Sequence, residues 1–304
     1  MKIAGVSMTY NDGYKLKEWK EHYEGYKDEL DYYVIVDNGS EKYYLNELEK
    51  VFKDVVVIKR KINGGCTAAY NDGIRYILNN TDADAIVIIA NDFKIKKGCL
   101  HKMYEYLNSD ELLGLVSTAI LEKDSTKVAN YGHRIDRYKV IGLDRGKDIQ
   151  EIKPDRKYTD LVAGGFYMAK RKFYKDVGLQ DEKLFMYGDE YDTAIRAKRA
   201  GYKVGVTCET YGWHWHINEP NASGRRPASN YLIARNRIYV VRKHFGKEMV
   251  LGSFWHFSLR LASKFAISGL LKKNKESLER AKFCLMGGIN GLKGDMSINK
   301  YTKF

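Results

Sequence analysis

The sequence predicts an α/β protein with a mostly parallel central sheet flanked by helices, followed by a helical C-terminal extension. Short runs rich in Val and Ile alternate with amphipathic stretches through the first 120 residues. Apolar runs of this kind are typical of parallel strands that helices cover on both faces. Charged residues break the rhythm over 121–160, and the pattern after residue 226 is helical. A chain of 304 residues is long enough to bury the core that such a fold needs.

The expected elements follow one another in a regular order. Strands are predicted over 3–8, 32–37, 55–59, 85–90 and 113–120, and helices over 15–26, 66–78 and 97–108. Residues 121–160 are predicted to form loops and a hairpin, and regular structure returns at 161–171 and at 184–207. We therefore expect a domain over 1–225, with halves 1–120 and 121–225, and a helical region over 226–304.

The net charge and the cysteine pattern indicate which binding partners and which cellular compartment to expect for this protein. The 52 Lys and Arg against 39 Asp and Glu give a net charge of +13, which favours an anionic partner. Because no nucleic-acid-binding motif accompanies the charge, we expect a nucleotide or an acidic membrane surface rather than nucleic acid. The cysteines form no CxxC pair and indicate a reducing cytosol; they are Cys66, Cys99, Cys208 and Cys284. We expect no signal peptide and no transmembrane helix.

Polar residues follow three of the predicted strands, where open parallel sheets bind their ligands. These ends read TYND (Thr9 to Asp12), VDNGS (Val36 to Ser40) and ANDF (Ala90 to Phe93). Asp37 suits either turn chemistry or recognition of a nucleotide base or ribose. Asp92 suits either a surface turn or a divalent metal that bridges a diphosphate.

Three further stretches could carry chemistry. NGGCTAAYNDGI (Asn63 to Ile74) is either a helix entry or a seat for phosphate or sugar, and it is neither GxGxxG nor a Walker A motif. In YGWHWHI, His214 and His216 share one face of an extended chain, which suits a metal, a diphosphate or an aromatic cluster.

The third stretch, LFMYGDEYD, brings three carboxylates to a helix start. Asp189 can cap the helix, Asp192 stands where a capping box needs its acid, and Gly201 can end the helix. Capping does not require Glu190, which is therefore a candidate general base.

The order of these motifs resembles that of family 2 glycosyltransferases with the GT-A (Rossmann-like) fold, and the chain is most similar in character to rhamnosyltransferase-like members. VIVDNGS resembles the nucleotide-binding strand end, IVIIANDF occupies the D-x-D position, and the block ending in GDEYD resembles the acceptor side with its base motif. The helix YLIARNRIYVVRKHFG resembles the one that follows in the family. Two departures stand out: Ala90-Asn91-Asp92 keeps one acid of the metal motif, and the base pair reads Asp189-Glu190 in reversed order.

The resemblance implies an inverting hexosyl- or deoxyhexosyltransferase, with 1–120 binding the nucleotide and 121–225 the acceptor. It implies a UDP- or dTDP-linked sugar donor, a glycan or lipid-linked acceptor in cell-surface polysaccharide (cell wall) synthesis, and Glu190 or Asp189 as the base. Asp92, His214 and His216 would hold Mg²⁺ or Mn²⁺, with cationic help from Arg235, Arg237 or His216. Donor contacts would come from Thr9, Asn11, Asp37, Asn38, Asn63, Gly64, Asn71, Asn91, Asp92, Gly165 and Arg235.

The C-terminal region could lie on a membrane. Apolar residues recur at helical spacing at Leu251, Phe254, Phe257, Leu261 and Phe265. This face could be interfacial on an anionic bilayer, or it could be core-packed or a homodimer contact. We expect a cytoplasmic protein, peripheral on the inner membrane face if the first reading holds.

Two other functions compete with transfer. A sugar nucleotidyltransferase would share the sheet and the metal acid, but it would show a glycine-rich loop with Arg or Lys after the first strand, where SMTYNDGYK stands. A nucleotide- or glycan-binding protein with a degenerate site would fit the single acid of the metal motif.

Overall fold

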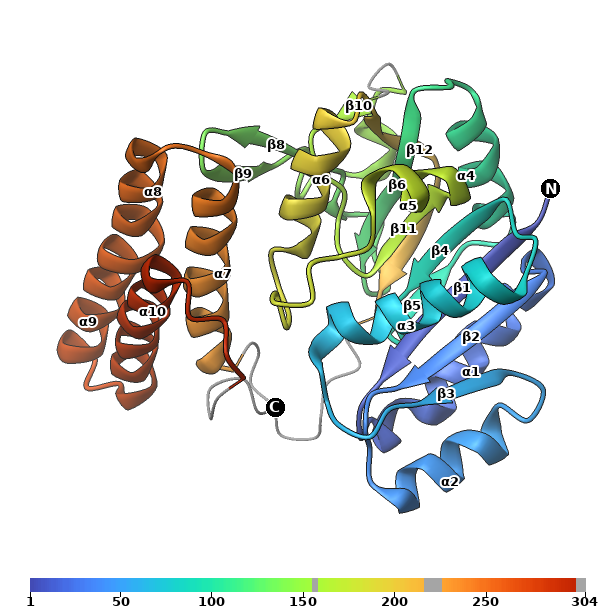
Figure 1. Ribbon diagram of the computed structural model, residues 1–304, viewed down its shortest axis with the longest axis horizontal. Helices are drawn as coiled ribbons and strands as arrows, with labels where there is room; N and C mark the ends of the chain where they lie inside the picture. Colours follow the sequence, from blue (N-terminus) through green and yellow to red (C-terminus); the bar gives the residue numbers. More distant parts are fainter. Residues whose placement is uncertain (155–157, 216–225, 299–304) are drawn as a thin grey trace. The chain divides into compact units, whose positions relative to one another are not determined.

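The computed structural model describes residues 1–154, 158–215 and 226–298 (Figure 1). The chain divides into two compact units. The first unit comprises 1–134, 141–180 and 193–219, and the second comprises 135–140, 181–192 and 220–304. The acidic stretch at 189–192 therefore packs with the helical region, although the sequence analysis placed it with residues 1–225.

A ten-stranded sheet forms the centre of the first unit (Figure 1). Its main path runs β10-β12-β6-β11-β4-β1-β2-β3, while β5 pairs with β12 and β7 with β6. The pairs among β3, β2, β1 and β4 are parallel, and β11 is inserted antiparallel between β4 and β6. The mostly parallel sheet is as predicted. The strands are β1 (Ile3–Thr9), β2 (Tyr32–Asp37), β3 (Val56–Lys59), β4 (Ala85–Ile89), β5 (Phe93–Ile95), β6 (Leu113–Glu122), β7 (Val128–Asn130), β10 (Tyr158–Thr159), β11 (Phe166–Lys170) and β12 (Lys203–His214).

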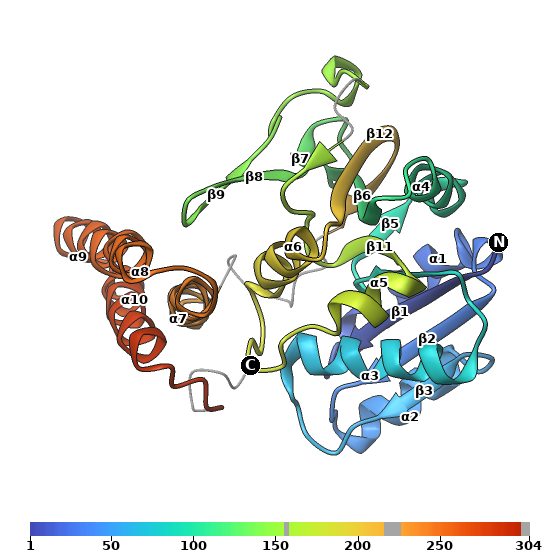
Figure 2. The ribbon, with the colours of Figure 1, turned by 45° about the horizontal axis from the view of Figure 1, so that its top comes forward.

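Helices cover both faces of this sheet (Figure 2). Side chains alternate along the buried strand β4, so that Ile86 and Ile88 pack under α3 and α5 whereas Val87 and Ile89 pack under α4. The helices of this unit are α1 (Leu16–Glu24), α2 (Lys42–Val51), α3 (Gly65–Asn80), α4 (Cys99–Asn108) and α5 (Arg171–Val177), with short turns η1 (Gly13–Lys15), η2 (Lys27–Glu29) and η3 (Ile149–Glu151).

One helix differs from the sequence-based expectation, and one hairpin agrees with it. The amphipathic helix α2 was not predicted, and it packs Tyr44 and Leu48 onto the sheet beside α1. Residues 121–160 contain the predicted hairpin, formed by β8 (His133–Asp136) and β9 (Lys139–Gly142).

The second unit is helical, as predicted. Glycines let its helices approach closely, because a Cβ on Gly287 would lie 2.2 Å from the carbonyl oxygen of Tyr231. Helix α6 spans Asp189–Arg199, and its first residues, up to Asp192, belong to this unit. The other helices are α7 (Ala228–His244), α8 (Lys247–Phe254), the π-helical segment η4 (Trp255–Arg260), α9 (Leu261–Leu271) and α10 (Lys275–Lys293). Among residues 1–154, 158–215 and 226–298, none of the helices combines the length and apolar character that crossing a bilayer requires.

Candidate active site

The turns after β1, β2 and β4 meet at one edge of the sheet. Thr9 and Asp37 are register partners at the ends of β1 and β2. The hydroxyl of Ser7 donates a 2.5 Å hydrogen bond to the carbonyl oxygen of Ile89, which aligns the end of β4 with β1. Residues that are far apart in sequence therefore lie at one edge of the sheet, at the carboxyl ends of the strands, where open parallel sheets bind their ligands.

Asp37 carries a buried carboxylate with unused hydrogen-bonding capacity. The residue is 1% exposed. Its Oδ2 accepts a hydrogen bond from the backbone N–H of Ser40 at 3.2 Å, and its Oδ1 has no hydrogen-bond partner among the described residues. Since buried polar atoms are nearly always hydrogen-bonded, this oxygen suits a donor group on a ligand, such as a ribose hydroxyl. Thr9 lies beside it, fully buried, with its hydroxyl bonded to that of Tyr44.

The asparagines of these turns shape the edge by binding one another and the backbone. Asn11 adopts a φ of 51°, and its Oδ1 accepts a hydrogen bond from the N–H of Glu41 at 2.9 Å. The buried amide of Asn38 donates to Asn63 Oδ1 at 2.9 Å and accepts from the N–H of Gly64 at 3.1 Å. These bonds hold the turns after β1, β2 and β3 in fixed positions.

Two predicted donor contacts are better explained as structural links. The side chain of Asn71 is 1% exposed, donates to the carbonyl oxygen of Gln180 at 2.9 Å and accepts from its N–H at 3.0 Å. Arg235 is fully buried within the second unit, where it donates to Asn236 Oδ1 at 3.0 Å and to the carbonyl oxygen of Ser297 at 3.1 Å. We assign a donor contact to neither residue, although the buried Nη2 of Arg235 has no hydrogen-bond partner among the described residues.

Gly165 has a different use. It adopts a φ of +85°, a backbone conformation that favours glycine. Its carbonyl oxygen accepts a 2.7 Å hydrogen bond from the N–H of Ala90. Gly165 thereby fixes the start of the Asn91-Asp92 turn.

Asp92 and His214 form a contact pair at the end of β4. The Nε2 of His214 lies 3.3 Å from Asp92 Oδ2, and the imidazole stacks on Phe93 with ring centroids 4.7 Å apart. The N–H of Trp215 donates to the carbonyl oxygen of Asp92 at 2.8 Å. The antiparallel pairing of β5 with β12 brings these residues together.

Asp12 and Lys15 join this pair, and neither was predicted as a site residue from the sequence. Asn91 donates to Asp12 Oδ2 at 2.8 Å, while Lys15 Nζ lies 3.4 Å from Asp12 Oδ1 and 3.3 Å from Asn91 Oδ1. Burial opposes the charge on Lys15, but the carboxylates of Asp12 and Asp92 outweigh it and raise the pKa of the lysine above its ordinary value. Asp12 stands inside the quoted TYND motif, so its position was the available signal. We call Asp12, Lys15, Asn91, Asp92 and His214 the strand-end cluster.

The strand-end cluster has ligands that suit a divalent cation. His216, the third predicted ligand, lies outside the described residues, and within them no three His, Cys, Asp or Glu side chains gather around one point. Mg²⁺ commonly binds one or two carboxylates together with substrate phosphates and water. Asp92 and His214 can supply two ligands. The residues therefore fit a metal that is shared with a diphosphate.

The acidic stretch at the start of α6 corrects the predicted capping box. Gly188, with a φ of +91°, precedes the helix and its carbonyl oxygen accepts from the N–H of Asp192 at 3.1 Å, so Asp189 is the first helical residue and not the cap. Asp192 is fully buried, and its Oδ1 lies 2.8 Å from Lys243 Nζ and 2.7 Å from His244 Nε2. The carboxylate of Asp192 thus links α6 to α7. Gly201, with a φ of +83°, follows the end of the helix as predicted.

Asp189 and Glu190 form a carboxyl pair in a partly desolvated place. Burial raises the pKa of both, and the charge of Glu190 raises that of Asp189 further. The guanidinium of Arg237 opposes the rise for Glu190. Arg237 itself stacks 4.2 Å from the ring centroid of Tyr191, and its buried Nη1 has no hydrogen-bond partner in the described part of the chain. The pair therefore favours a proton on Asp189 and a negative charge on Glu190.

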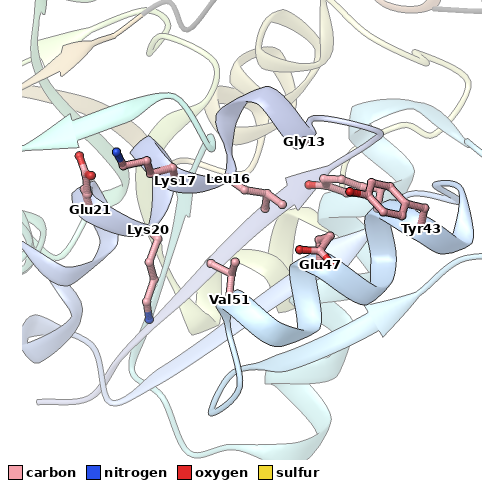
Figure 3. A pocket seen from close by; sticks show the side chains of 9 residues that line it. Gly13, Leu16, Lys17, Lys20, Glu21, Tyr43, Glu47 and Val51 are labelled. Carbon is pink, nitrogen blue, oxygen red and sulfur yellow. The ribbon is translucent and has the colours of Figure 1, made fainter.

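A surface groove of about 680 Å³ lies elsewhere in the first unit (Figure 3). It runs between α1 and α2, and Leu16, Tyr44 and Val51 line it together with charged side chains. None of the residues predicted to bind donor or metal lines this groove. We assign it no part in the reaction.

The chain is similar to a hexosyltransferase of Haloferax volcanii over most of its length. It is 25% identical over 270 residues to the low-salt glycan biosynthesis hexosyltransferase Agl10 of Haloferax volcanii, a match that covers 86% of this chain and 84% of the relative.

Solved structures share the fold. The chain is 14% identical to GalNAc-T7, solved with UDP, GalNAc and Mn²⁺, with a TM-score of 0.64 over 97% of this chain and 56% of that one, so it spans about half of that protein. The mannosyltransferase PcManGT of Pyrobaculum calidifontis, in complex with GDP-Man and Mn²⁺, is also 14% identical, with a TM-score of 0.57 over 97% of this chain and 88% of that one. S. aureus TarS 1–349 is 14% identical, with a TM-score of 0.53 and coverage of 97% and 82%. These similarities support the GT-A fold.

The family model for glycosyl transferase family 2 matches residues 9–178, which include the strand ends, the strand-end cluster without His214, and Gly165. This match extends over more than half of the chain. The protein therefore belongs to glycosyl transferase family 2.

Proposed function

We propose that this glycosyltransferase moves a hexosyl or deoxyhexosyl group from a nucleotide-diphosphate sugar to an acceptor hydroxyl, with inversion at the anomeric carbon. The observation that carries the proposal is the strand-end cluster, where a half-buried lysine and a His–Asp pair meet at the carboxyl ends of parallel strands. A preorganised place of this kind, with Lys15 and ligands for a divalent cation, suits the diphosphate that departs in the reaction.

On the donor side, each residue has a role that its environment supports. Asp37, through its unpaired Oδ1, accepts a hydrogen bond from the ribose or base. Lys15 keeps a positive charge beside the diphosphate, and Asp12 and Asn91 position that charge. Mg²⁺ or Mn²⁺, when bound by Asp92 and His214, would neutralise charge on the diphosphate oxygens. The relatives solved with UDP or GDP-mannose and Mn²⁺ support a nucleoside-diphosphate donor, and we retain a UDP or dTDP donor as the proposal.

On the acceptor side, Glu190 takes the proton from the attacking hydroxyl. As the new bond forms at the anomeric carbon, the bond to the diphosphate breaks on the opposite face, and the leaving group departs with the electron pair. Arg237 opposes the rise that burial causes in the pKa of Glu190 and so favours its charged form, while burial and the charge of Glu190 raise the pKa of Asp189 and favour a proton there. The chemistry needs one base, and the pair supplies one.

The acceptor is proposed to be a glycan or a lipid-linked glycan in cell-surface polysaccharide synthesis. The relative from Haloferax volcanii, named for glycan biosynthesis, supports this class. A lipid-linked acceptor would place a cytoplasmic enzyme at the inner face of the membrane.

The test is a donor screen on the purified full-length protein. UDP-, dTDP- and GDP-linked sugars are offered with and without Mn²⁺ or Mg²⁺, and the release of nucleoside diphosphate is followed. We expect one donor class to be turned over and the Glu190→Gln variant to be nearly inactive. Pyrophosphate in place of nucleoside diphosphate would indicate a nucleotidyltransferase, and donor binding without turnover for any acceptor class would indicate a binding protein; either result overturns the proposal.

A further inference from the structure

The second unit exposes an apolar surface that differs from the predicted one. Phe254, Phe257, Leu261 and Phe265 are half-buried, and the last two pack against the core that α9 forms with α10. Four of the five residues of the predicted interfacial face are therefore half-buried, and Leu251 is exposed. On the helix from Lys247 to Leu271 the exposed large apolar side chains are Leu251 (65%), Trp255 (59%), Ile267 (58%), Leu270 (69%) and Leu271 (80%).

These side chains form one stripe along a continuous helix. Helices α8, η4 and α9 follow one another without a break from Lys247 to Leu271 (Figure 1). A spacing of four residues would drift around a regular α-helix, because 3.6 residues complete a turn. The π-helical segment η4 has more residues per turn and offsets that drift. Leu251, Trp255, Ile267 and Leu270 therefore stay in line along one side of the helix.

The opposite side of the same helix is occupied by small residues. Ser253, Ser258, Ala262 and Gly269 are buried. A Cβ on Gly269 would lie 2.7 Å from the side chain of Leu278, so α9 contacts α10 closely there. The helix thus has a packed side of small residues and an outer side of large apolar ones, which is the reverse of what a solvated surface helix shows.

The charges around the stripe have one sign. Between Met249 and Lys275 the sequence holds five basic residues and no Asp or Glu. All five are exposed, and they are Arg260, Lys264, Lys272, Lys273 and Lys275. Basic side chains that border an exposed apolar stripe match an anionic lipid surface, where the apolar groups enter the headgroup region and the cations approach the phosphates.

We propose that the stripe Leu251, Trp255, Ile267, Leu270 and Leu271, with its basic border, binds the surface of an anionic lipid bilayer. The helix lies along the bilayer plane and does not cross it. This inference does not rest on the transfer reaction, because it concerns a different face and needs no donor.

The test measures binding of the full-length protein to vesicles without nucleotide. Vesicles of phosphatidylcholine with one quarter phosphatidylglycerol are compared with pure phosphatidylcholine, by co-sedimentation and by the emission of Trp255. We expect binding to the anionic vesicles to be at least about tenfold stronger, to weaken with added salt, and to shift tryptophan emission to shorter wavelength.

Variants connect the binding to the stripe. Leu270→Glu/Leu271→Glu should reduce binding by about tenfold or more, and Lys272→Glu/Lys273→Glu should reduce it on anionic vesicles. Leu112→Glu, which changes a leucine that is 50% exposed in the first unit, is the matched control and should bind as the unmodified protein does. Circular dichroism and Tm confirm that each variant is folded.

Three results would overturn the inference. They are equal affinity for both kinds of vesicle, unchanged binding by the folded Leu270→Glu/Leu271→Glu variant, and light scattering that shows a dimer which this variant abolishes. The last result would make a second copy of the chain the occupant of the stripe.

Discussion

The strand-end cluster and the start of α6 both contain several carboxylates, but the surroundings of these carboxylates differ. In the strand-end cluster, Asp12 faces the ammonium of Lys15 and Asp92 faces the imidazole of His214, so each carboxylate has a polar partner. At the start of α6, burial raises the pKa of Asp189 and of Glu190, and the charge of Glu190 raises that of Asp189 further. The first arrangement suits holding a charged ligand, whereas the second suits accepting a proton.

The same difference between a carboxylate with close partners and a carboxyl group with a raised pKa is found within one turn of α6. Asp192 follows Glu190 by two positions, yet it is fully buried against Lys243 and His244. Of these three neighbouring acids, Asp192 is therefore a structural carboxylate bound to Lys243 and His244, whereas Asp189 and Glu190 form a carboxyl pair with raised pKa values. The environment of each side chain, and not its residue type, assigns the role.

Removing the proposed base should have the largest effect. Glu190→Gln should lower kcat by about 10³-fold, because general bases typically contribute 10²- to 10⁴-fold. Asp189→Asn should cost no more than about tenfold, since asparagine resembles the protonated acid. Steady-state kinetics of nucleoside diphosphate release compares the two. The reverse order of effects would move the base to Asp189.

Breaking the paired acid should act on stability instead. Asp192→Asn leaves Lys243 and His244 without their shared carboxylate and should lower the free energy of unfolding by about 3 kcal/mol. Urea denaturation followed by circular dichroism measures this change. Asp181→Asn is the control, because Asp181 contacts Lys243 at 2.7 Å but is partly exposed, and its loss should cost less. Equal costs would argue against a special role for the buried pair.

In the strand-end cluster, neutralising one carboxylate should impair the chemistry without changing its pH dependence. Asp92→Asn should lower kcat/KM by on the order of 10²-fold and raise the Mn²⁺ concentration needed for half-maximal activity. The acid limb of the pH profile should stay where it is, because that limb belongs to the α6 pair. A shifted limb with unchanged metal dependence would contradict the division of roles.

The smallest effect should be a gain in stability. The folded state holds a proton on Asp189 more tightly than the unfolded state does, so stability is lost as pH rises from the unfolded pKa, about 3.9, through the raised folded pKa. Asp189→Asn removes this penalty and should raise Tm at pH 7 by on the order of 2 °C, with no gain below pH 4. Thermal unfolding at both pH values measures it. A lower Tm for the variant at pH 7 would mean that the ionised form is stabilised.

Much of the fold follows from local pattern in the sequence. The continuous Val and Ile runs of β2 and β4 predict strands that are covered on both faces, and the structure has them so. Helix α2 was not predicted, because its tyrosines and charged residues resemble those of a polar connection. Only the structure shows that Tyr44 and Leu48 pack on the sheet. The buried and exposed sides of α9 could not be predicted from the sequence either, because both sides carry apolar residues. Only the packing of α10 against this helix determines which side is buried.

The site was predictable where a motif stands at a strand end and not where tertiary contacts decide. Asp37 and Asp92 were identified from position alone, and they lie at the edge where ligands bind such sheets. Lys15 carries no local signal, because only folding brings it within 3.4 Å of Asp12. For Asn71, the motif suggested a contact with the donor, whereas the structure shows that its side-chain amide links α3 to Gln180.

The anomeric configuration of the transferred sugar tests the central claim most directly. Proton NMR of the purified product, compared with the donor, gives the configuration from the coupling constant of the anomeric proton. A single displacement assisted by Glu190 predicts that the configuration is inverted. Retention of the donor's configuration would contradict the account, because it requires a second displacement or front-face chemistry that one base at the start of α6 does not provide.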